Sequence, residues 1–413
     1  LIDRGHQFAT NSDTEVLVHL YEEYGDDFLS HLEGMFAVAL WDVRKQKLIL
    51  ARDRIGIKPL YYWDDCGNVA FASEIKAIAT LPGFTVAVDA DALAEYTGIG
   101  YAVAPKTIFE GVHKLPPASA LTWQDNNFEI RQYWSPPGET DESRSYEDWV
   151  DRVRHELERA VKDHMVSDVP VGAFLSGGID SSAVVSLMGG SAEQQLTTYS
   201  IGYKGGQVAE YYNELPYARE VAERMGTRHC EIEVQPDVAR LLPRLIWHLE
   251  EPISDSAIMT TYLVSELAAK SVKVILSGVG GDELFAGYNR YLGDHYNNRY
   301  QKVPGWCRNH LLPPLARLLP SGRQNRLMDL SRYAKRFLQA SEMDWRARYR
   351  YFLAIANDDV VDSLLQQAST KGANGFAAAA SAESSSDELL RLFRIDWQTQ
   401  LAENLLLLTD KMS

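Results

Sequence analysis

Short apolar runs alternate with helical segments through the middle of the chain. Four runs have the length and apolar character of strands: residues 169–175, 196–203, 228–234 and 271–276. Residues 213–226 and 256–270 lie between strand candidates and read as helices. Strands that alternate with helices pair in parallel through right-handed crossovers, and ligands bind beyond the carboxyl ends of such strands. The pattern therefore predicts an α/β fold with a doubly wound parallel sheet and a site at that edge.

The N-terminal part of the chain has a different pattern of short alternating segments. Its strand candidates are residues 36–41, 47–51, 59–63 and 69–72. They predict part of a layered α-β-β-α domain over residues 1–135, with residues 81–145 crossing towards the next domain. The polar and turn-rich residues 136–145 predict a linker, and residues 146–413 a second domain. A length of 413 residues agrees with two domains.

The first parallel strand candidate leads directly into a Ser-Gly-Gly-Ile-Asp-Ser-Ser turn, which opens a helix. Gly177 and Gly178 allow backbone dihedrals that other residues avoid, so consecutive N–H groups can point into one concavity. The helix that follows adds its positive N-terminal end. The polar side chains of the turn are the hydroxyls of Ser176, Ser181 and Ser182 and the carboxylate of Asp180, which can hold Mg²⁺. The complete heptapeptide predicts a pyrophosphate-binding loop and disfavours an ordinary strand-to-helix turn.

A second loop of the same kind follows the strand candidate at residues 271–276. It reads Ser277-Gly278-Val279-Gly280-Gly281-Asp282-Glu283 and precedes another helical segment. Both loops then lie at one sheet edge, so Asp180 and Asp282 are expected to face one crevice and to share a magnesium ion. Asp282 has a structural alternative as a helix N-cap, which is compatible with the first role.

The charge balance bears on partners. With 57 acidic and 41 basic residues, the formal charge is −16, and such a surface repels a phosphate backbone. A nucleic-acid partner is therefore disfavoured. The basic residues are concentrated at Arg332, Lys335, Arg336, Arg346, Arg348 and Arg350. We interpret this group as a solvated helix face.

Cysteine and histidine usage bears on compartment and metals. Cys66, Cys230 and Cys307 are odd in number and far apart, which favours a reduced, cytosolic compartment and argues against a disulfide framework or a zinc site. The ten histidines show no H-x-x-x-H or comparable pairing, so we expect any metal to be the one that ATP brings. No apolar run approaches the ~20 residues of a membrane span, so no membrane partner is expected. A homodimer is compatible with these observations.

The two loops together resemble those of a known family. The first resembles the loop of the ATP pyrophosphatases, and its combination with the second, Leu-Ser-Gly-Val-Gly-Gly-Asp-Glu-Leu-Phe-Ala-Gly-Tyr, is similar to the synthetase domain of glutamine-hydrolysing asparagine synthetase. Glu250-Glu251-Pro252 and Asp255 are similar to the segment just upstream of that family's second loop. Residues 12–15, 32–42 and 51–62 resemble the later part of a class II glutamine amidotransferase domain.

The resemblance implies an activity and a set of site residues. Glutamine would be hydrolysed in the first domain and ammonia passed to the second, where aspartate and ATP give β-aspartyl-AMP and pyrophosphate before ammonia displaces AMP. Leu175, Ile201, Ser277 and Gly278 match positions that line the nucleotide, the first two chiefly through backbone groups. Asp13 matches the partner of the α-ammonium of glutamine, with the N-cap of a helix near Thr14 as its structural alternative.

The resemblance also implies residues that do not occur here. The family's nucleophile is an N-terminal cysteine, its glutamine-binding Asn-Gly-Glu segment would precede Leu1, and its catalytic lysine would follow Ser413. Cys66 is internal and has no free α-amino group, so it does not fit the nucleophile's role. We therefore expect the chain to be a fragment that is truncated at both ends.

Val279 departs from the family pattern. Asparagine synthetases have an acidic residue there and the related β-lactam synthetases have tyrosine, so the position follows the acceptor, and another carboxylate such as Glu283 would have to accept the proton. Three alternatives to the leading reading are a sibling enzyme that amidates another carboxylate, a non-catalytic module, and a tRNA-modifying member of the pyrophosphatase group. The two complete loops argue against the second alternative. The acidic charge and the lack of paired cysteines disfavour the third.

Overall fold

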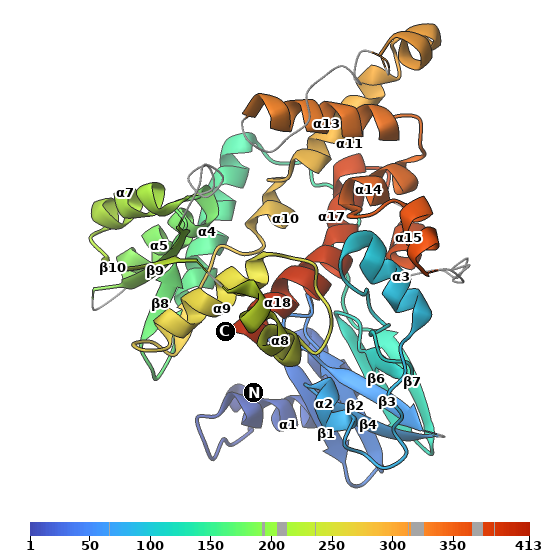
Figure 1. The fold of residues 1–413 in the computed structure, drawn as a ribbon. Coiled ribbons are helices and arrows are strands. Elements are labelled where there is room, and N and C mark those ends of the chain that lie inside the picture. Colours follow the sequence, from blue (N-terminus) through green and yellow to red (C-terminus); the bar gives the residue numbers. More distant parts are fainter. Residues whose placement is uncertain are drawn as a thin grey trace.

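The computed structural model describes residues 1–65, 67–191, 195–204, 213–235, 237–312, 314, 326–365, 375–383 and 385–413. A β-rich N-terminal part lies at one end of the molecule and a parallel sheet at another, with the C-terminal helices between them (Figure 1). None of the described helices is long and apolar enough to cross a lipid bilayer.

The N-terminal part contains two antiparallel sheets, with strand orders β1-β2-β6-β7 and β4-β3-β5. The strands are β1 (Ala37–Asp42), β2 (Lys47–Arg52), β3 (Tyr61–Asp65), β4 (Asn68–Ala72), β5 (Val112–Lys114), β6 (Ser119–Gln124) and β7 (Asn127–Gln132). Leu50 pairs with Leu121 on β6 and packs against Tyr62, between the sheets. Its neighbours Ile49 and Ala51 pack on the opposite face, because successive side chains in a strand alternate.

Helices cover both outer faces of these two sheets. Residues of α1 (Asp13–Tyr24) pack on Ile49 and Ala51, while α2 (Ile75–Ile78) packs on Tyr61 and Val112 of the other sheet. The remaining helices of this part are η1 (Ile2–Arg4), η2 (Gly25–His31) and α3 (Ala90–Ile99). The layers therefore follow the order α-β-β-α, and the predicted fold class is confirmed.

The prediction that residues 81–145 only cross between domains is wrong. This stretch contributes β5, β6 and β7, which complete both sheets. Pro116 and Pro117 lie in the connection between β5 and β6, where proline breaks no ladder hydrogen bond. The carbonyls of Pro136 and Pro137 both accept hydrogen bonds from Arg394 Nη1 at 2.9 Å, so the start of residues 136–145 is held by the C-terminal helices.

The second sheet region is fully parallel, with strand order β10-β9-β8-β11. Its strands are β8 (Val171–Phe174), β9 (Thr197–Tyr203), β10 (Arg228–Val234) and β11 (Val274–Leu276). Helix α9 (Ala257–Ala268) packs on one face, against Tyr199, and helices α4 (Tyr146–His164), α5 (Ile179–Ser191) and α7 (Leu215–Met225) pack on the other, against Ala173. The predicted doubly wound architecture is confirmed. This region also contains α8 (Val238–Leu249) and α10 (Gly281–Phe285).

The C-terminal region is helical and connects the two sheet regions (Figure 1). Its helices are α11 (Asn289–Tyr300), η3 (Cys307–Leu311), α13 (Arg326–Ala340), α14 (Trp345–Leu353), α15 (Asp358–Leu365), α16 (Gly375–Ala382), α17 (Glu388–Asp396), η4 (Trp397–Leu406) and α18 (Leu407–Met412). Tyr291, Tyr349, Phe376 and Ile395 form their common core, which also includes Val103 from the N-terminal part.

The interpretation of the basic residues as a solvated helix face is wrong for Arg348 and Arg336, whereas Arg346 is exposed and also bonds to a neighbouring helix. Arg348 is only 7 % exposed and donates to the carbonyl of Met343. Arg346 Nε donates to the carbonyl of Ala380 at 2.9 Å, and Arg336 Nη2 to that of Tyr351 at 2.8 Å. These guanidinium groups satisfy carbonyl oxygens between helices, a role that local sequence does not reveal.

Candidate active site

A cavity of about 380 Å³ opens at the carboxyl ends of β8 and β9. Both glycine-rich loops contribute to its wall, together with residues of α9 and α10. The predicted site residues in the wall are Leu175, Ser176, Gly178, Asp180, Ser181, Ile201, Ser277, Gly278, Val279 and Asp282. Gly177 and Ser182 belong to the first loop but do not line the cavity. The structure thus brings the two predicted loops to one site, at the sheet edge where a parallel α/β fold binds ligands.

The first loop is closed by its own serines. The hydroxyls of Ser176 and Ser181 are 2.9 Å apart, and the N–H of Gly178 donates to Ser176 Oγ at 3.2 Å. Gly177 has φ of 81°, and a Cβ on it would lie 2.5 Å from the backbone of Tyr217 on α7. Gly178 does not share this positive φ, so only one of the two glycines is required by its dihedral.

The hydroxyls predicted as donors differ in their surroundings. Ser181 is 8 % exposed, and its hydroxyl also reaches the Gly178 carbonyl. Ser182 Oγ is buried without a hydrogen-bond partner, and the N–H of Ser182 donates to the Gly178 carbonyl in the first turn of α5. Ser176 is therefore the hydroxyl of this loop that is best placed to face a ligand.

The two loops are in direct contact. A Cβ on Gly281 would lie 2.4 Å from Asp180 Cγ, and one on Gly278 would lie 2.6 Å from the backbone nitrogen of Ser181. A third glycine, Gly287, leaves similar room for Asp282, whose Oδ1 would be 1.7 Å from an added Cβ. Glycine is required at these positions because the carboxylates and the neighbouring backbone occupy the space of a side chain.

Asp180 and Asp282 form a pair of carboxylates at this contact. Burial raises the pKa of Asp282, and the negative charge of Asp180 raises it further, while Arg290 opposes both effects. Two carboxylates that repel each other beside a phosphate-binding loop are a suitable donor set for Mg²⁺, which uses a few carboxylates together with phosphate oxygens. The residues present therefore fit this ion. The structural alternative for Asp282, a helix N-cap, is wrong, because Gly280 occupies the N-cap position of α10.

The backbone groups of Leu175 and Ile201 differ in whether they can form hydrogen bonds to a ligand. The N–H of Leu175 donates to the Tyr199 carbonyl at 2.9 Å, and its own carbonyl accepts from the Ser200 hydroxyl. Backbone groups alternate in direction along a strand, so the peptide groups of Ile201 point to the same side as those of Tyr199. The last β8–β9 pair is Phe174 with Tyr199, so Ile201 lies beyond the end of β8. Ile201 therefore offers free backbone groups to the cavity, whereas the Leu175 N–H is already used.

The cavity wall near Val279 contains a buried carboxyl. Glu283 is fully buried and accepts a hydrogen bond from the Tyr288 hydroxyl at 2.5 Å. Burial raises the pKa of Glu283, although the bond from Tyr288 opposes this. Val279 is 45 % exposed in the same wall. Glu283 therefore lines the same cavity as Val279 and has a pKa that is raised in the direction of neutral pH, as a general base requires.

Asp13 is the first residue of α1 in the N-terminal part and does not line this cavity. It is exposed, and its Oδ1 accepts a hydrogen bond from the Thr14 hydroxyl at 3.2 Å. The N-cap of α1 is Ser12, so the structural alternative for Asp13 is wrong. Cys66 lies outside the described residues.

Sequence reasoning missed the role of the Glu250-Glu251-Pro252 segment, which joins the N-terminal part to the rest of the chain. Glu250 accepts from the backbone N–H of Lys76 at 2.9 Å and from Lys411 Nζ at 2.8 Å. Glu251 is 2.9 Å from Lys114 Nζ on β5 and accepts from the N–H of Ile108. The motif was visible, but its partners lie far away in the sequence.

A buried ionic network extends this contact. Lys114 Nζ also lies 3.0 Å from Glu403 on η4, and Glu403 lies 3.2 Å from Arg52 on β2. All four side chains are at most 3 % exposed. Although burial opposes it, the positive charges of Lys114 and Arg52 lower the pKa of Glu403. Burial raises the pKa of Glu251, and the charge and hydrogen bond of Lys114 oppose this effect.

Comparisons with known proteins agree with this arrangement. Residues 152–413 match the asparagine synthase family and residues 1–134 the glutamine amidotransferase domain. The glutamine-hydrolysing asparagine synthetases 1 and 3 of Bacillus subtilis strain 168 are 35 % and 38 % identical to this chain, over 78 % and 69 % of it. The amidase chyE of Penicillium rubens is 33 % identical over 70 % of the chain. The matches cover 50 %, 48 % and 45 % of these relatives, so the chain spans about half their length.

The two glycine-rich loops on a parallel sheet, joined to a layered α-β-β-α domain, define a two-part α/β protein whose first part matches a glutamine amidotransferase domain. The family match over residues 152–413 makes the assignment specific. The chain belongs to the asparagine synthase family, a family of ATP-dependent ligases.

Proposed function

We propose that this chain forms part of a glutamine-dependent asparagine synthetase, in which the cavity between the two loops activates aspartate with ATP. The proposal rests on the contact of Asp180 with Gly281, the neighbour of Asp282, which supports a pair of carboxylates beside the first loop. The names of the Bacillus relatives support aspartate as the acceptor. ATP, aspartate, and glutamine or ammonia are then the partners, and Mg²⁺ is the metal.

In the proposed reaction, a carboxylate oxygen of aspartate attacks the α-phosphorus of ATP, and the bond to the bridging oxygen of the β-phosphate breaks. The residues 176–182 hold the leaving pyrophosphate through backbone N–H groups, the Ser176 hydroxyl and the N-terminus of α5. Asp180 and Asp282 would hold Mg²⁺, which neutralises phosphate charge when bound. Ammonia then attacks the acyl carbon of β-aspartyl-AMP, loses a proton, and displaces AMP.

The remaining roles follow from position. Ile201 would contact the adenine through its free backbone groups, with Ser277 and Gly278 on the nucleotide's other side. Asp13 would pair with the α-ammonium of glutamine in the N-terminal part. Glu283 would accept the proton that ammonia loses, because the side chain of Val279 has no group that could accept it. A cytosolic location and a homodimer stay predictions from the sequence.

A second candidate is an enzyme that amidates a different carboxylic acid. Val279 favours it, because this wall position of the cavity carries an apolar side chain.

Pyrophosphate release from Mg²⁺-ATP tests both candidates in a protein completed at both ends, with ammonia as nitrogen donor and aspartate or other carboxylic acids as acceptors. Release with aspartate, accompanied by asparagine, supports the first candidate, and release only with another acid supports the second. Asp180→Asn should abolish release, whereas Asp168→Asn should not, because Asp168 is exposed and lies outside the cavity wall. Absence of release with every acid would refute both and favour a non-catalytic module.

A further inference from the structure

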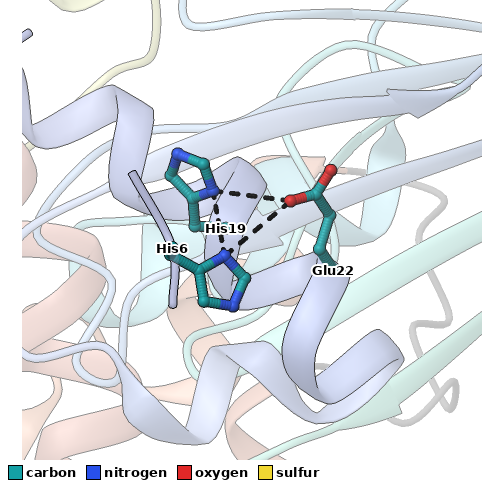
Figure 2. A group of neighbouring side chains, drawn as sticks. All are labelled: His6, His19 and Glu22. Atoms are coloured by element: carbon teal, nitrogen blue, oxygen red, sulfur yellow. Dashed lines mark hydrogen bonds and ion pairs between the residues drawn. The ribbon is translucent and has the colours of Figure 1, made fainter. Parts of the chain in front are cut away.

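The N-terminal segment brings two histidines and a glutamate together, although the sequence spacing gave no sign of it. His6 precedes α1, whereas His19 and Glu22 lie on that helix, and the three side chains converge (Figure 2). Their ligand atoms all lie within 4.8 Å of one another. The Nδ1 atoms of the histidines are 3.1 Å apart, and Glu22 Oε2 is 3.4 Å from that of His19 and 3.9 Å from that of His6.

The other nitrogen of each ring faces a second carboxylate. His6 Nε2 is 3.1 Å from Glu23 Oε2, and His19 Nε2 is 3.7 Å from Glu15 Oε1. Carboxylates at Nε2 favour the tautomer with the proton on that nitrogen, as in the carboxylate–histidine–metal arrangement.

Both Nδ1 atoms then carry lone pairs and face each other across 3.1 Å, beside an anionic oxygen. Such a triangle of donors is unstable without a cation or a shared proton at its centre. In a tetrahedral zinc site with bonds of about 2.0–2.2 Å, neighbouring ligand atoms are about 3.3–3.6 Å apart. The observed separations of 3.1, 3.4 and 3.9 Å bracket this value.

We propose that His6, His19 and Glu22 form a binding site for a divalent transition-metal ion, with Zn²⁺ as the expected ion. Two imidazoles and one carboxylate suit Zn²⁺ and not Mg²⁺, which prefers oxygen ligands. Glu22 is 61 % exposed, so water can occupy the fourth position. The bound ion holds the segment around His6 against α1. This site is separate from the ATP cavity and does not depend on the proposed reaction.

Zinc titration of the chelator-treated protein, measured by competition with a chromophoric chelator, tests the proposal. We expect one Zn²⁺ per chain to be lost in His6→Gln and in His19→Gln, and the affinity to fall about 10- to 100-fold in Glu23→Gln, which removes only the supporting carboxylate. His155→Gln is the matched control, since His155 is an exposed histidine on α4. Co²⁺ should give the visible absorption of a tetrahedral site in the parent and not in His6→Gln.

Glu22→Gln tests the site with little risk to the fold, because the Glu22 side chain is largely exposed. Its circular dichroism should match the parent while its zinc affinity falls. Equal zinc stoichiometry in the parent and in His6→Gln would overturn the proposal. Failure of the folded parent to bind Zn²⁺ or Co²⁺ would also overturn it and would assign the pair to a shared proton.

Discussion

Replacing Glu403 and Glu251 separately with glutamine should have opposite consequences, although both carboxylates contact the same Lys114 nitrogen, at 3.0 and 2.9 Å. Glutamine imitates a protonated carboxyl, so its effect follows the direction of the pKa shift. The pKa of Glu403 is lowered, since Lys114 and Arg52 outweigh burial, and the charge therefore stabilises the fold. Burial raises the pKa of Glu251, so its charge does not.

Glu403→Gln should lower the free energy of unfolding at neutral pH by about 3–5 kcal/mol, the usual cost of removing one partner from a buried ion pair. Glu251→Gln should cost less than about 1 kcal/mol or stabilise the protein, since glutamine can still accept from the Ile108 N–H. Glu156→Gln is the control, because Glu156 pairs with Arg159 while both are half-exposed. That change should stay within about 1 kcal/mol.

Urea unfolding, followed by circular dichroism between acidic and neutral pH, measures these differences. The cost of Glu403→Gln is expected in full above the ordinary glutamate pKa of about 4.3 and should vanish as the pH falls through the lower pKa of the folded state. Any advantage of Glu251→Gln should instead appear as the pH rises above about 4.3. Equal costs for the two variants, or a pH-independent cost of Glu403→Gln, would refute the reasoning.

Three further predictions concern the cavity. Gly177→Ala should weaken ATP binding and lower the free energy of unfolding by about 1–3 kcal/mol, because Gly177 has a positive φ. Gly190→Ala is the control: it has open space on α5 and should stabilise the helix by up to about 1 kcal/mol. Calorimetry measures the stability and the ATP affinity of both variants. Asp282→Asn should raise the melting temperature of the ligand-free protein near neutral pH, because a carboxyl with a raised pKa loses its stabilising effect as the pH rises through that pKa. The same variant should abolish Mg²⁺-dependent ATP binding, and an unchanged Mg²⁺ affinity would contradict the role of Asp282 as a ligand. Glu283→Gln should remove the acidic limb of the pH–rate profile of ammonia-dependent amide formation, which rises as this carboxyl ionises above the ordinary range; retention of that limb would exclude Glu283 as the base.

The sequence predicts the parallel sheet well because its information is local. Residues 228–234 were expected as a strand and are β10, with the same bounds. The loops at Ser176 and Ser277 were found because glycine, serine and aspartate at fixed offsets leave few other structures. In both cases the pattern lies within about ten neighbouring residues.

The features that were missed depend on distant partners. The spacing of His6 and His19 matches no metal-binding motif, and only the return of the first segment onto α1 brings them together. Arg348 reads as a surface residue until its carbonyl partner is known. Glu250 and Glu251 were recognised as a motif, but their roles depend on Lys76 and Lys114 in the other part of the chain.

The contact of Arg52 with Glu403 has a consequence for synthesis of the chain. The two residues are 351 positions apart, so Arg52 emerges from the ribosome long before its partner exists. At about 5–20 residues per second, this delay is roughly 20–70 s. During that time the N-terminal sheets carry two cations, Arg52 and Lys114, on a surface that awaits the last helices. A nascent chain of this protein therefore presents a positively charged docking face, which Glu251 neutralises in part at Lys114 and Glu403 completes once the C-terminal segment is made.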